Sequence, residues 1–314
     1  MTQAIVFSLA GNEPIAACIA SRLGAQVGSL ERRAFPDGET YLRYPDELRG
    51  RAVILVCSLD RPDAKFLPLI FAADAARDLG AGSVTLVAPY LAYMRQDKRF
   101  LPGEAITSQS FARKLSATFD SLVTVDPHLH RYQGLADIYS IPTTIAHSAP
   151  VIARWISDNI ESPFVIGPDT ESEQWVSEVA ELSRSPYRVM QKQRRGDRDV
   201  RITVPDLGAF HNRTPVLVDD IVSSGRTMLE TAKLLREKMP PPACIAVHAL
   251  LSDEAYGSLL NIVRTVASTN TIEHRSNQID ISAIISEATR TSLTDLHRKL
   301  NLPLDMDQNG TPGS

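Results

Sequence analysis

The sequence predicts an α/β protein with two tandem, similar domains, each a three-layer arrangement around a parallel sheet. Short apolar runs alternate with stretches of helical periodicity, which is the pattern of parallel strands covered by helices. An internal repeat is the second observation: residues 54–58, a helix and residues 84–88 parallel residues 216–220, a helix and residues 245–249. Chance similarity between strand–helix–strand units is the competing explanation of this repeat.

Runs of aliphatic and β-branched residues define the expected strands, and small or apolar residues at helical spacing define the expected helices. In the first half these elements are a strand at 4–9, a helix at 15–23, an extended segment at 26–35, strands at 40–44 and 52–57, a helix at 66–79, a strand at 83–89, a polar loop at 90–104, a helix at 106–118 and a strand at 122–125.

A break around Pro142 and Pro150 opens the second series. Its expected elements are a helix at 151–157, a strand at 164–166, a helix at 173–182, a strand at 187–191, a basic stretch at 192–201, a strand at 215–218, a helix at 227–238, a strand at 244–250, a helix at 254–260, a strand at 262–268 and a long amphipathic helix at 279–300. We therefore expect an N-terminal domain at 1–146, a C-terminal domain at 147–302 and a disordered tail at 303–314. The last helix can pack back on the first domain.

Composition indicates a soluble, cytoplasmic protein. The chain has 314 residues, 43% of them hydrophobic and 22% charged, as in ordinary globular proteins. A net charge of −4 argues against nucleic-acid binding, and no apolar run is long enough for a membrane span. Cys18, Cys57 and Cys244 are far apart in apolar surroundings, which favours core residues in a reducing compartment.

The stretch 215–227 carries the strongest chemical signal. An apolar strand ends directly in Asp219 and Asp220, and a Ser-Ser-Gly loop then leads into a helix. At the carboxyl edge of a parallel sheet, loop amides and a helix N-terminus favour a phosphate, while the two carboxylates can accept hydrogen bonds from hydroxyls. A sugar phosphate suits both features. An N-capping Asp followed by an ordinary turn is the alternative.

Further stretches that can carry chemistry are 35–39, 93–99, 126–130, 167–171 and 192–198. The first could be a plain Pro-Asp-Gly turn, and the charged runs could be solvated loops. Arginine can nevertheless clamp phosphate, and a basic loop can neutralise a phosphoryl-transfer transition state. His128 and His130 follow a strand without the spacing of a zinc site, so oxygen ligands nearby would favour Mg²⁺. Asp169 could simply cap a helix.

The order of these motifs resembles the phosphoribosyl pyrophosphate (PRPP) synthase family, also called ribose-phosphate diphosphokinases, of type I phosphoribosyltransferase-like fold. The resemblance runs from about residue 30 to 300 and rests on Phe35-Pro36-Asp37-Gly38-Glu39, Arg95-Gln96-Asp97, Asp126-Pro127-His128, Gly167-Pro168-Asp169, Lys192-Gln193-Arg194, Val218-Asp219-Asp220 and Thr269-Asn270-Thr271-Ile272.

This resemblance implies the reaction and the residue roles. The β,γ-diphosphoryl group of MgATP would pass to the 1-hydroxyl of ribose 5-phosphate, giving PRPP and AMP for nucleotide biosynthesis. The implied roles are ATP binding by Phe35, Asp37 and Glu39 of a neighbouring subunit and by Arg95, Gln96 and Asp97, Mg²⁺ binding by His128 and Asp169, catalysis by Lys192 and Arg194, and ribose 5-phosphate binding by Asp219, Asp220, Ser223, Ser224, Gly225, Arg226 and Thr227. A shared ATP site implies a homodimer or larger homo-oligomer.

The chain departs from the family at two places, and alternatives stay open. Many members have an Asp where this chain has Ser223, and small residues are commoner where it has Thr-Glu-Ser-Glu at 170–173. A phosphoribosyltransferase would share 215–227 but would not need the motifs of the first half. A catalytically inactive regulatory homologue or a sugar-phosphate sensor would keep the fold, although the loop cations Lys192 and Arg194 count against inactivity.

Overall fold

The computed structural model of the chain describes residues 2–9, 11–168, 172–195, 199–203, 207–300 and 304–305. It divides into two compact units, which are described separately below. Unit 1 joins the first 146 residues with those that follow Ile281, and unit 2 spans His147–Ile281.

A parallel sheet forms the centre of unit 1. Its strands run in the order β17-β1-β5-β6-β7-β8, with β2 paired to β1. The bounds are β1 Thr2–Ser8, β2 Gln26–Val27, β5 Ala52–Val56, β6 Ser83–Ala88, β7 Ser121–Val125, β8 Thr143–Ala146 and β17 Leu304–Asp305. Every residue of β5, β6 and β7 is buried, as expected for strands covered on both faces.

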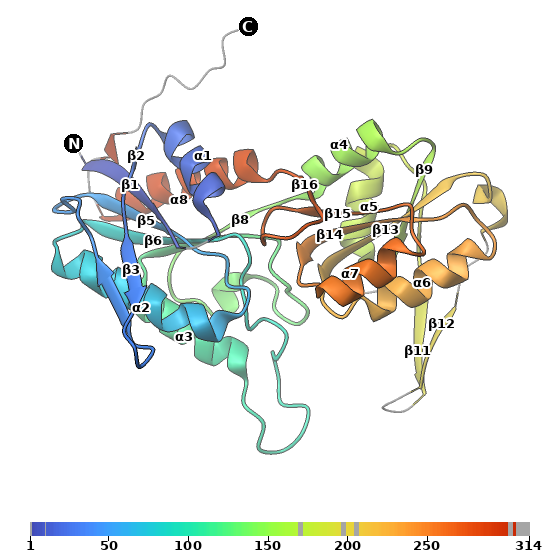
Figure 1. Cartoon of the computed structure of the whole chain (residues 1–314), viewed down its shortest axis with the longest axis horizontal. Helices are drawn as coiled ribbons and strands as arrows, with labels where there is room; N and C mark the ends of the chain where they lie inside the picture. The colour runs from blue at the N-terminus through green and yellow to red at the C-terminus, as the bar shows by residue number, and fades with distance from the viewer. Residues whose placement is uncertain are drawn as a thin grey trace, which may run out of the picture. The chain divides into compact units, whose positions relative to one another are not determined.

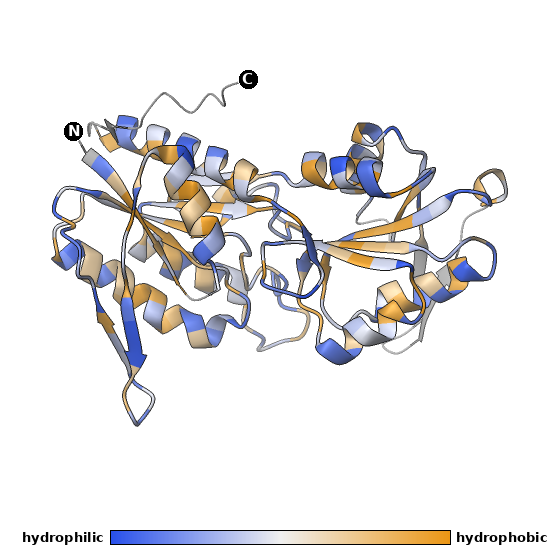
Figure 2. Ribbon diagram, turned by 45° about the horizontal axis from the view of Figure 1, so that its top comes forward, coloured by the Kyte–Doolittle hydropathy of each residue, from blue (hydrophilic) through white to orange (hydrophobic). Residues whose placement is uncertain are grey.

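Two pairs of helices cover the faces of this sheet (Figure 1). One pair is α1 (Glu13–Leu23) and α8 (Ser282–Leu300), and the other is α2 (Pro62–Asp78) and α3 (Thr107–Thr118). Buried small and apolar residues line each contact, among them Ala72, Ala73 and Ala76 of α2. Orange strands at the centre of each unit in Figure 2 mark the hydrophobic cores that result.

Unit 2 repeats this plan. Its sheet is parallel throughout, in the order β10-β9-β13-β14-β15-β16. The bounds of its strands are β9 Pro163–Gly167, β10 Tyr187–Val189, β13 Thr214–Val222, β14 Ala243–Ala249, β15 Thr265–Thr269 and β16 Asn277–Ile279. Its helices are α4 Ala149–Asn159, α5 Glu173–Leu182, α6 Arg226–Arg236 and α7 Asp253–Leu260. The pair α4 and α5 covers one face, and α6 and α7 cover the other (Figure 1).

Apart from β17, the strands of unit 1 correspond in order to those of unit 2, which confirms the predicted repeat of similar α/β domains. In each sheet the strand order follows the chain order from β1 to β8 or from β9 to β16, with a short extra strand, β2 or β10, at the first edge. Each unit also has an antiparallel hairpin at the same place in its sequence of elements. In unit 1 it is β3 (Glu31–Ala34) with β4 (Thr40–Arg43), and in unit 2 it is β11 (Gln191–Arg195) with β12 (Asp199–Thr203).

Several predicted boundaries are corrected by the structure. Helix α2 begins at Pro62 rather than at residue 66, because proline is suited to the first turn of a helix. Strand β13 continues through Asp219 and Asp220 to Val222, since its pairing with β14 persists past the acids. The basic stretch from residue 192 is a hairpin over its described residues, where a loop was expected.

Besides the strands of this hairpin, three short strands escaped prediction, and one helix changes unit. Strands β8 and β16 are edge strands without a long apolar run, and β17 pairs with β1 within the expected tail. The rest of that tail, residues 303 and 306–314, lies outside the described residues. Helix α8 was expected in the C-terminal domain, with the option of packing back. The structure assigns it to unit 1, where Ser292 Oγ donates to Ser121 Oγ at 3.2 Å.

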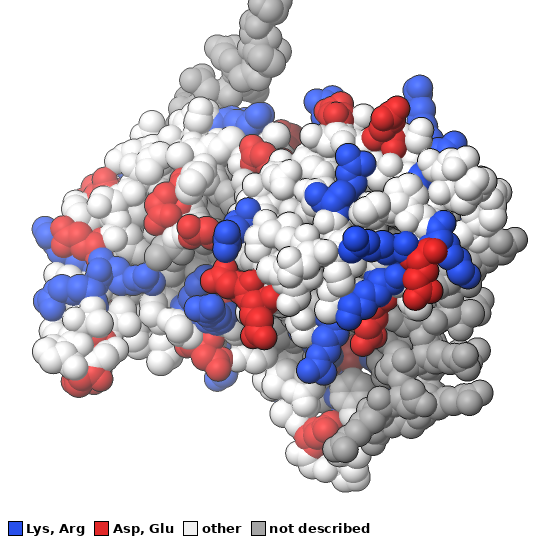
Figure 3. All heavy atoms as spheres, turned by 45° about the vertical axis from the view of Figure 1, so that its right-hand side comes forward, with Lys and Arg blue, Asp and Glu red and all other residues white. Residues whose placement is uncertain are grey.

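Charges on the surface are of mixed sign. On the face drawn in Figure 3, Lys and Arg are interspersed with Asp and Glu, and no broad field of positive charge is visible. Among the helices of the described residues, none has the length and apolar composition needed to cross a membrane.

Candidate functional site

The two acids of unit 2 lie near the carboxyl end of β13, where the sheet chemistry predicts a ligand. The backbone N–H of Asp220 donates to Asp219 Oδ1 at 3.0 Å, and the N–H of Ile221 donates to Asp220 Oδ1 at 2.7 Å. Both residues are half-buried. These local bonds fix the side-chain conformations of two carboxylates, a residue type able to accept hydrogen bonds from vicinal hydroxyls.

A tight turn connects these acids to α6. Gly225 has φ of +67° and precedes the first helical residue, Arg226. The N–H of Leu229 donates to the Gly225 carbonyl at 2.8 Å, which closes the first helical turn. The earlier N–H groups of a helix have no partner within the helix, so they point together with the positive end of the helix dipole at the space before it. An anion such as a phosphate fits this environment.

Replacement of Gly225 by alanine is expected to destabilise unit 2 by about 1–2 kcal/mol, the usual penalty for a side chain in the left-handed region. The new Cβ would also lie 3.0 Å from Leu251 Cδ2. Urea denaturation followed by tryptophan fluorescence measures this loss, because both tryptophans, Trp155 and Trp175, belong to unit 2. Gly257→Ala is the matched control, since its Cβ would meet no atom within 4 Å. Equal free energies of unfolding for Gly225→Ala and Gly257→Ala would contradict the expected strain at Gly225.

The stretch Thr269–Ile272 lies at the end of β15 and is held by buried hydroxyls. Thr269 Oγ1 donates to the Val247 carbonyl at 2.7 Å, and His248 Nδ1 is 2.9 Å from Thr271 Oγ1. Both threonines and His248 are buried. The motif that supported the family resemblance therefore stabilises the edge formed by β14 and β15, next to the acids of β13.

His274, just after this motif, is held as a neutral imidazole. The backbone N–H of Ser276 donates to His274 Nδ1 at 3.1 Å, so that nitrogen acts as an acceptor and the ring proton lies on Nε2. The Ser276 hydroxyl is 2.6 Å from the same nitrogen. Burial lowers the pKa of His274, and Arg275 acts in the same direction while Asp253 opposes it.

This histidine is expected to make unit 2 less stable in acid. Below the ordinary histidine pKa of about 6.5 the unfolded chain binds a proton that the folded chain does not, so the free energy of unfolding falls as the pH falls. We expect His274→Gln to reduce the drop in the urea midpoint between about pH 7.5 and 5.5, measured by tryptophan fluorescence. His211→Gln, at an exposed position, serves as the control. An unchanged pH dependence in His274→Gln would contradict the assignment.

In unit 1 the tip of the β3–β4 hairpin contains Phe35, Asp37 and Glu39. The N–H of Phe35 donates to the Glu39 carbonyl at 2.7 Å, the N–H of Glu39 donates to Asp37 Oδ1 at 3.2 Å, and Gly38 has φ of +93°. The Arg33 guanidinium lies 4.8 Å from the Phe35 ring centroid and 4.2 Å from that of Tyr41. The aromatic ring is thus held on an ordered, exposed tip.

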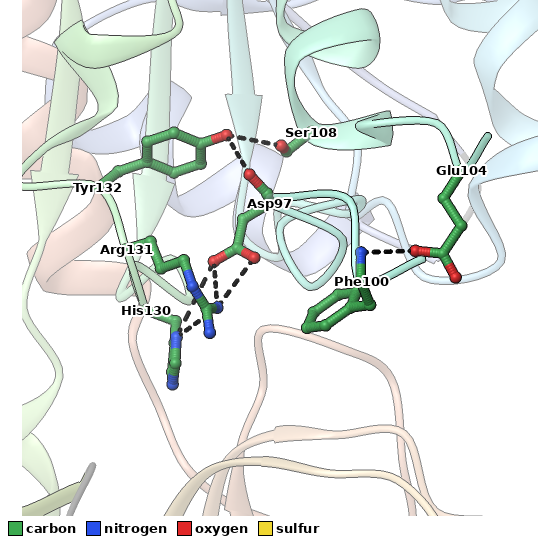
Figure 4. A network of polar contacts seen from close by, with 7 residues as sticks. All are labelled: Asp97, Phe100, Glu104, Ser108, His130, Arg131 and Tyr132. Atoms are coloured by element: carbon green, nitrogen blue, oxygen red, sulfur yellow. Dashed lines mark hydrogen bonds and ion pairs between the residues drawn. The ribbon is translucent and has the colours of Figure 1, made fainter. Parts of the chain in front are cut away.

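A polar network joins the segments that follow β6 and β7 (Figure 4). Arg131 Nη1 donates to Asp97 Oδ1 at 3.0 Å and to Oδ2 at 3.1 Å, and the Asp97 side chain is only 1% exposed. The Tyr132 hydroxyl donates to the Asp97 carbonyl at 3.2 Å. Because β6 and β7 are neighbours in the sheet, this network fixes the segment 95–97 against the segment 128–132.

His128 follows the turn at Asp126, where φ is +30°. Its ring lies nearly parallel to that of His130, with 6.1 Å between ring centroids and 20° between planes. His130 Nδ1 is also 3.9 Å from Asp97 Oδ2, so the histidine pair belongs to the same group of side chains as Asp97. The histidine pair and Asp97 therefore lie together after the carboxyl ends of β6 and β7.

Comparisons with known proteins decide the family. The N-terminal domain of ribose phosphate pyrophosphokinase matches residues 4–118, and the phosphoribosyl transferase domain matches residues 135–279. A ribose-phosphate pyrophosphokinase from Methanopyrus kandleri is 34% identical over 275 residues, which cover 86% of this chain and 93% of that protein. The chain belongs to the ribose-phosphate pyrophosphokinase family.

Other relatives agree with this membership. A ribose-phosphate pyrophosphokinase from Saccharolobus solfataricus is 36% identical over 275 residues, covering 84% of this chain and 91% of that protein. The crystal structure of phosphoribosylpyrophosphate synthetase from Mycobacterium smegmatis superposes with a TM-score of 0.81 at 23% identity, covering 94% of this chain and 100% of that one. The structural match shows that the two-unit fold is shared.

In this member of the ribose-phosphate pyrophosphokinase family, most of the predicted site residues form one group in each unit. Unit 2 brings together Asp219, Asp220 and the turn 223–227. Unit 1 brings together the segments 95–97 and 128–132, whereas the residues 35–39 lie on the separate hairpin. Lys192 and Arg194 are two residues apart in β11, at register positions opposite Ile202 and Val200.

The predicted magnesium ligands do not make a complete site in the described part of the chain. Asp169 lies outside the described residues, and His128 offers nitrogen, while Mg²⁺ prefers oxygen ligands. Within the described residues no group of three or more His, Cys, Asp or Glu is placed to hold a metal ion. His128 and Asp169 alone would thus leave most of the coordination positions of Mg²⁺ to other ligands.

Unit 1 has different chemistry where unit 2 has the two acids. Cys57 and Ser58 follow β5 at the position equivalent to Asp219 and Asp220, and burial raises the pKa of the Cys57 thiol to about 12. Lys65 Nζ donates to the Ser58 carbonyl at 2.9 Å and pairs with Asp60 at 2.5 Å. A neutral thiol and a serine stand where unit 2 has two carboxylates, so the repeat is asymmetric in chemistry.

The residues that support the site in unit 1 lie outside the predicted motifs. Arg131 and Tyr132 were not singled out, nor were Arg33 and Tyr41, which flank the ring of Phe35. Arg131 and Tyr132 follow closely after His128, and their charge and aromatic ring were the available sign that this segment extends beyond His130. Their contact with Asp97, 34 residues earlier, could be found only in the folded chain.

Proposed function

We propose that this ribose-phosphate pyrophosphokinase transfers the β,γ-diphosphoryl group of ATP to the 1-hydroxyl of ribose 5-phosphate. The observation that carries the proposal is the pair Asp219 and Asp220 at the end of β13, followed by the Gly225 turn at the N-terminus of α6. A family member with this combination has hydrogen-bond acceptors for the ribose and an anion site for the 5-phosphate.

Ribose 5-phosphate binding is assigned to unit 2. Asp219 and Asp220 accept hydrogen bonds from the ribose hydroxyls, while Ser223, Ser224, Gly225, Arg226 and Thr227 surround the 5-phosphate. The local hydrogen bonds of the two carboxylates support this role, because a preorganised acceptor costs less conformational entropy on binding. The family's more common Asp at position 223 is replaced by serine, which removes one negative charge beside the bound phosphate.

ATP binding is assigned to unit 1. Arg95 and Gln96 contact the nucleotide of their own chain, and Asp97 belongs to the same segment. Phe35, Asp37 and Glu39 contact the nucleotide of a neighbouring copy, so the active enzyme is a homodimer or a larger homo-oligomer. The exposed, ordered tip of the β3–β4 hairpin supports this assignment. Size-exclusion chromatography with light scattering tests it, and an active monomer would contradict it.

Lys192 and Arg194 are proposed as the catalytic cations. The ribose O1 attacks the β-phosphorus, the bond from that phosphorus to the α,β-bridging oxygen breaks, AMP leaves with that oxygen, and the hydroxyl proton is released. Negative charge concentrates on the phosphoryl oxygens in the transition state, so positioning and charge neutralisation supply most of the catalysis.

Mg²⁺ is proposed to arrive with ATP, where it neutralises part of the triphosphate charge, with His128 and Asp169 as its protein contacts. The described residues supply too few oxygen donors to hold the ion alone, which is consistent with a metal that enters as MgATP.

The deciding experiment incubates the purified chain with MgATP and ribose 5-phosphate and measures both products. AMP and PRPP in equal amounts would establish the diphosphokinase. PRPP-dependent consumption of a nucleobase without any AMP formation would favour a phosphoribosyltransferase. Absence of AMP with every divalent metal tested, with and without inorganic phosphate, would exclude the proposed reaction.

A further inference from the structure

We propose that Arg131 is a positioning residue for the nucleotide site of unit 1. Through its contact with Asp97 it holds the segment 95–97, which carries Arg95 and Gln96, against the segment 128–132, and it does not itself contact the substrate. This inference rests on the assignment of ATP to unit 1, and it adds a residue that no motif of the sequence contained.

The first support is the geometry of the Asp97 carboxylate. Its side chain is 1% exposed, and one nitrogen of Arg131 lies 3.0 and 3.1 Å from its two oxygens. A carboxylate buried to this degree remains charged only if it is paired. Asp97 is therefore directed into the protein (Figure 4), and its contribution to ATP binding is indirect.

The second support is that both peptide carbonyls at this point are also bound. The N–H of Ser108 donates to the Gln96 carbonyl at 3.3 Å, and the Tyr132 hydroxyl donates to the Asp97 carbonyl at 3.2 Å. That hydroxyl is 2.9 Å from Ser108 Oγ. The segment thus has contacts from α3 on one side and from residues 131 and 132 on the other, which leaves its backbone little freedom.

The third support is electrostatic. An unpaired carboxylate beside a triphosphate would repel it, and Arg131 compensates that charge at hydrogen-bond distance. The Arg131 guanidinium carbon also lies 5.8 Å from the Phe100 ring centroid, and Arg131 Nη1 lies 2.8 Å from His130 Nδ1. The same cation therefore orders three side chains around the segments that carry Arg95 and His128.

The test compares four full-length variants by steady-state kinetics and by calorimetric binding of α,β-methylene-ATP, whose bridging carbon blocks diphosphoryl transfer. Arg131→Met removes the cation, and Asp97→Asn/Arg131→Met removes both charges of the pair. Arg131→Lys keeps a cation that can approach both oxygens, because the native contact uses a single nitrogen. Arg113→Met, at an exposed position of α3, is the matched control.

We expect Arg131→Met and the double variant to raise the KM for ATP and the dissociation constant of the analogue about tenfold or more, with the KM for ribose 5-phosphate unchanged. Arg131→Lys should recover most of the affinity, and Arg113→Met should match the wild type. The double variant carries no buried unpaired charge, so its melting temperature should stay close to that of the wild type. If Arg131→Met fails to fold, the analogue affinity of the double variant tests the proposal instead.

Wild-type analogue affinity in a folded double variant would overturn the proposal, as would an equal loss for both substrates. The analogue measurement does not need turnover. A wild-type protein that binds the analogue without forming AMP would refute the proposed reaction and leave the role of Arg131 to be judged from binding alone.

Discussion

Replacement of Lys192 by alanine is expected to lower the turnover number by a factor on the order of 10³ while leaving the affinity for ribose 5-phosphate nearly intact. The proposed role of this cation is to neutralise charge that develops only in the transition state, so its loss should reduce kcat and spare ground-state binding. Steady-state kinetics with both substrates varied separates these effects. Direct calorimetric binding of ribose 5-phosphate provides the second measurement.

The control for this prediction is Lys233→Ala. Lys233 lies in the same unit at an exposed position of α6, so its loss changes the charge of unit 2 by the same amount. Lys192→Arg should retain more activity than Lys192→Ala because it keeps the positive charge. Near-normal turnover of Lys192→Ala would remove Lys192 from the catalytic residues.

Replacement of Asp220 by asparagine is expected to lower kcat/KM for ribose 5-phosphate about 100-fold with little change in the KM for ATP. Two hydrogen bonds from hydroxyls to a charged acceptor are together worth about 3 kcal/mol or more, and each 1.4 kcal/mol corresponds to a factor of ten. Asparagine keeps an oxygen that can accept the N–H of Ile221, so the local backbone should not change. Kinetics and calorimetric binding of ribose 5-phosphate measure the loss.

Asp253→Asn is the matched control for the loss of a carboxylate. It lies in the same unit at the start of α7, and its side chain is 84% exposed. Asp219→Asn should resemble Asp220→Asn, since each carboxylate is held by the N–H that follows it. An unchanged KM for ribose 5-phosphate in both Asp219→Asn and Asp220→Asn would refute the sugar-binding role of the pair.

The fold was predictable because its central strands are buried on both faces. Such strands, for example 52–56 and 216–218, need continuous apolar residues and therefore stand out in the sequence. Edge strands such as Asn277–Ile279 have polar residues and few positions, and their pairing is decided by the neighbouring strand. The position of α8 in unit 1 is likewise set by tertiary packing, since its amphipathic pattern would suit either sheet.

The candidate site likewise contains residues that could be predicted from the sequence and residues that could not. Unit 2 holds its acids and phosphate turn in one continuous stretch, 219–227, so local residue chemistry was sufficient to find it. The support of unit 1 depends on Asp97 meeting Arg131 and Tyr132 across neighbouring strands. No spacing rule connects such residues. Asp97 was therefore recognised within its motif, whereas the residues that hold it were not.

The matched hairpins β3–β4 and β11–β12 have a consequence for how this chain can be altered. Each is a two-stranded sheet that is not paired with the main sheet of its unit. One has an aromatic residue and two acids at its tip, and the other has cations along its first strand. Each hairpin is therefore a place where residues for recognition or catalysis can be introduced without changing the strand pairing of the main sheet.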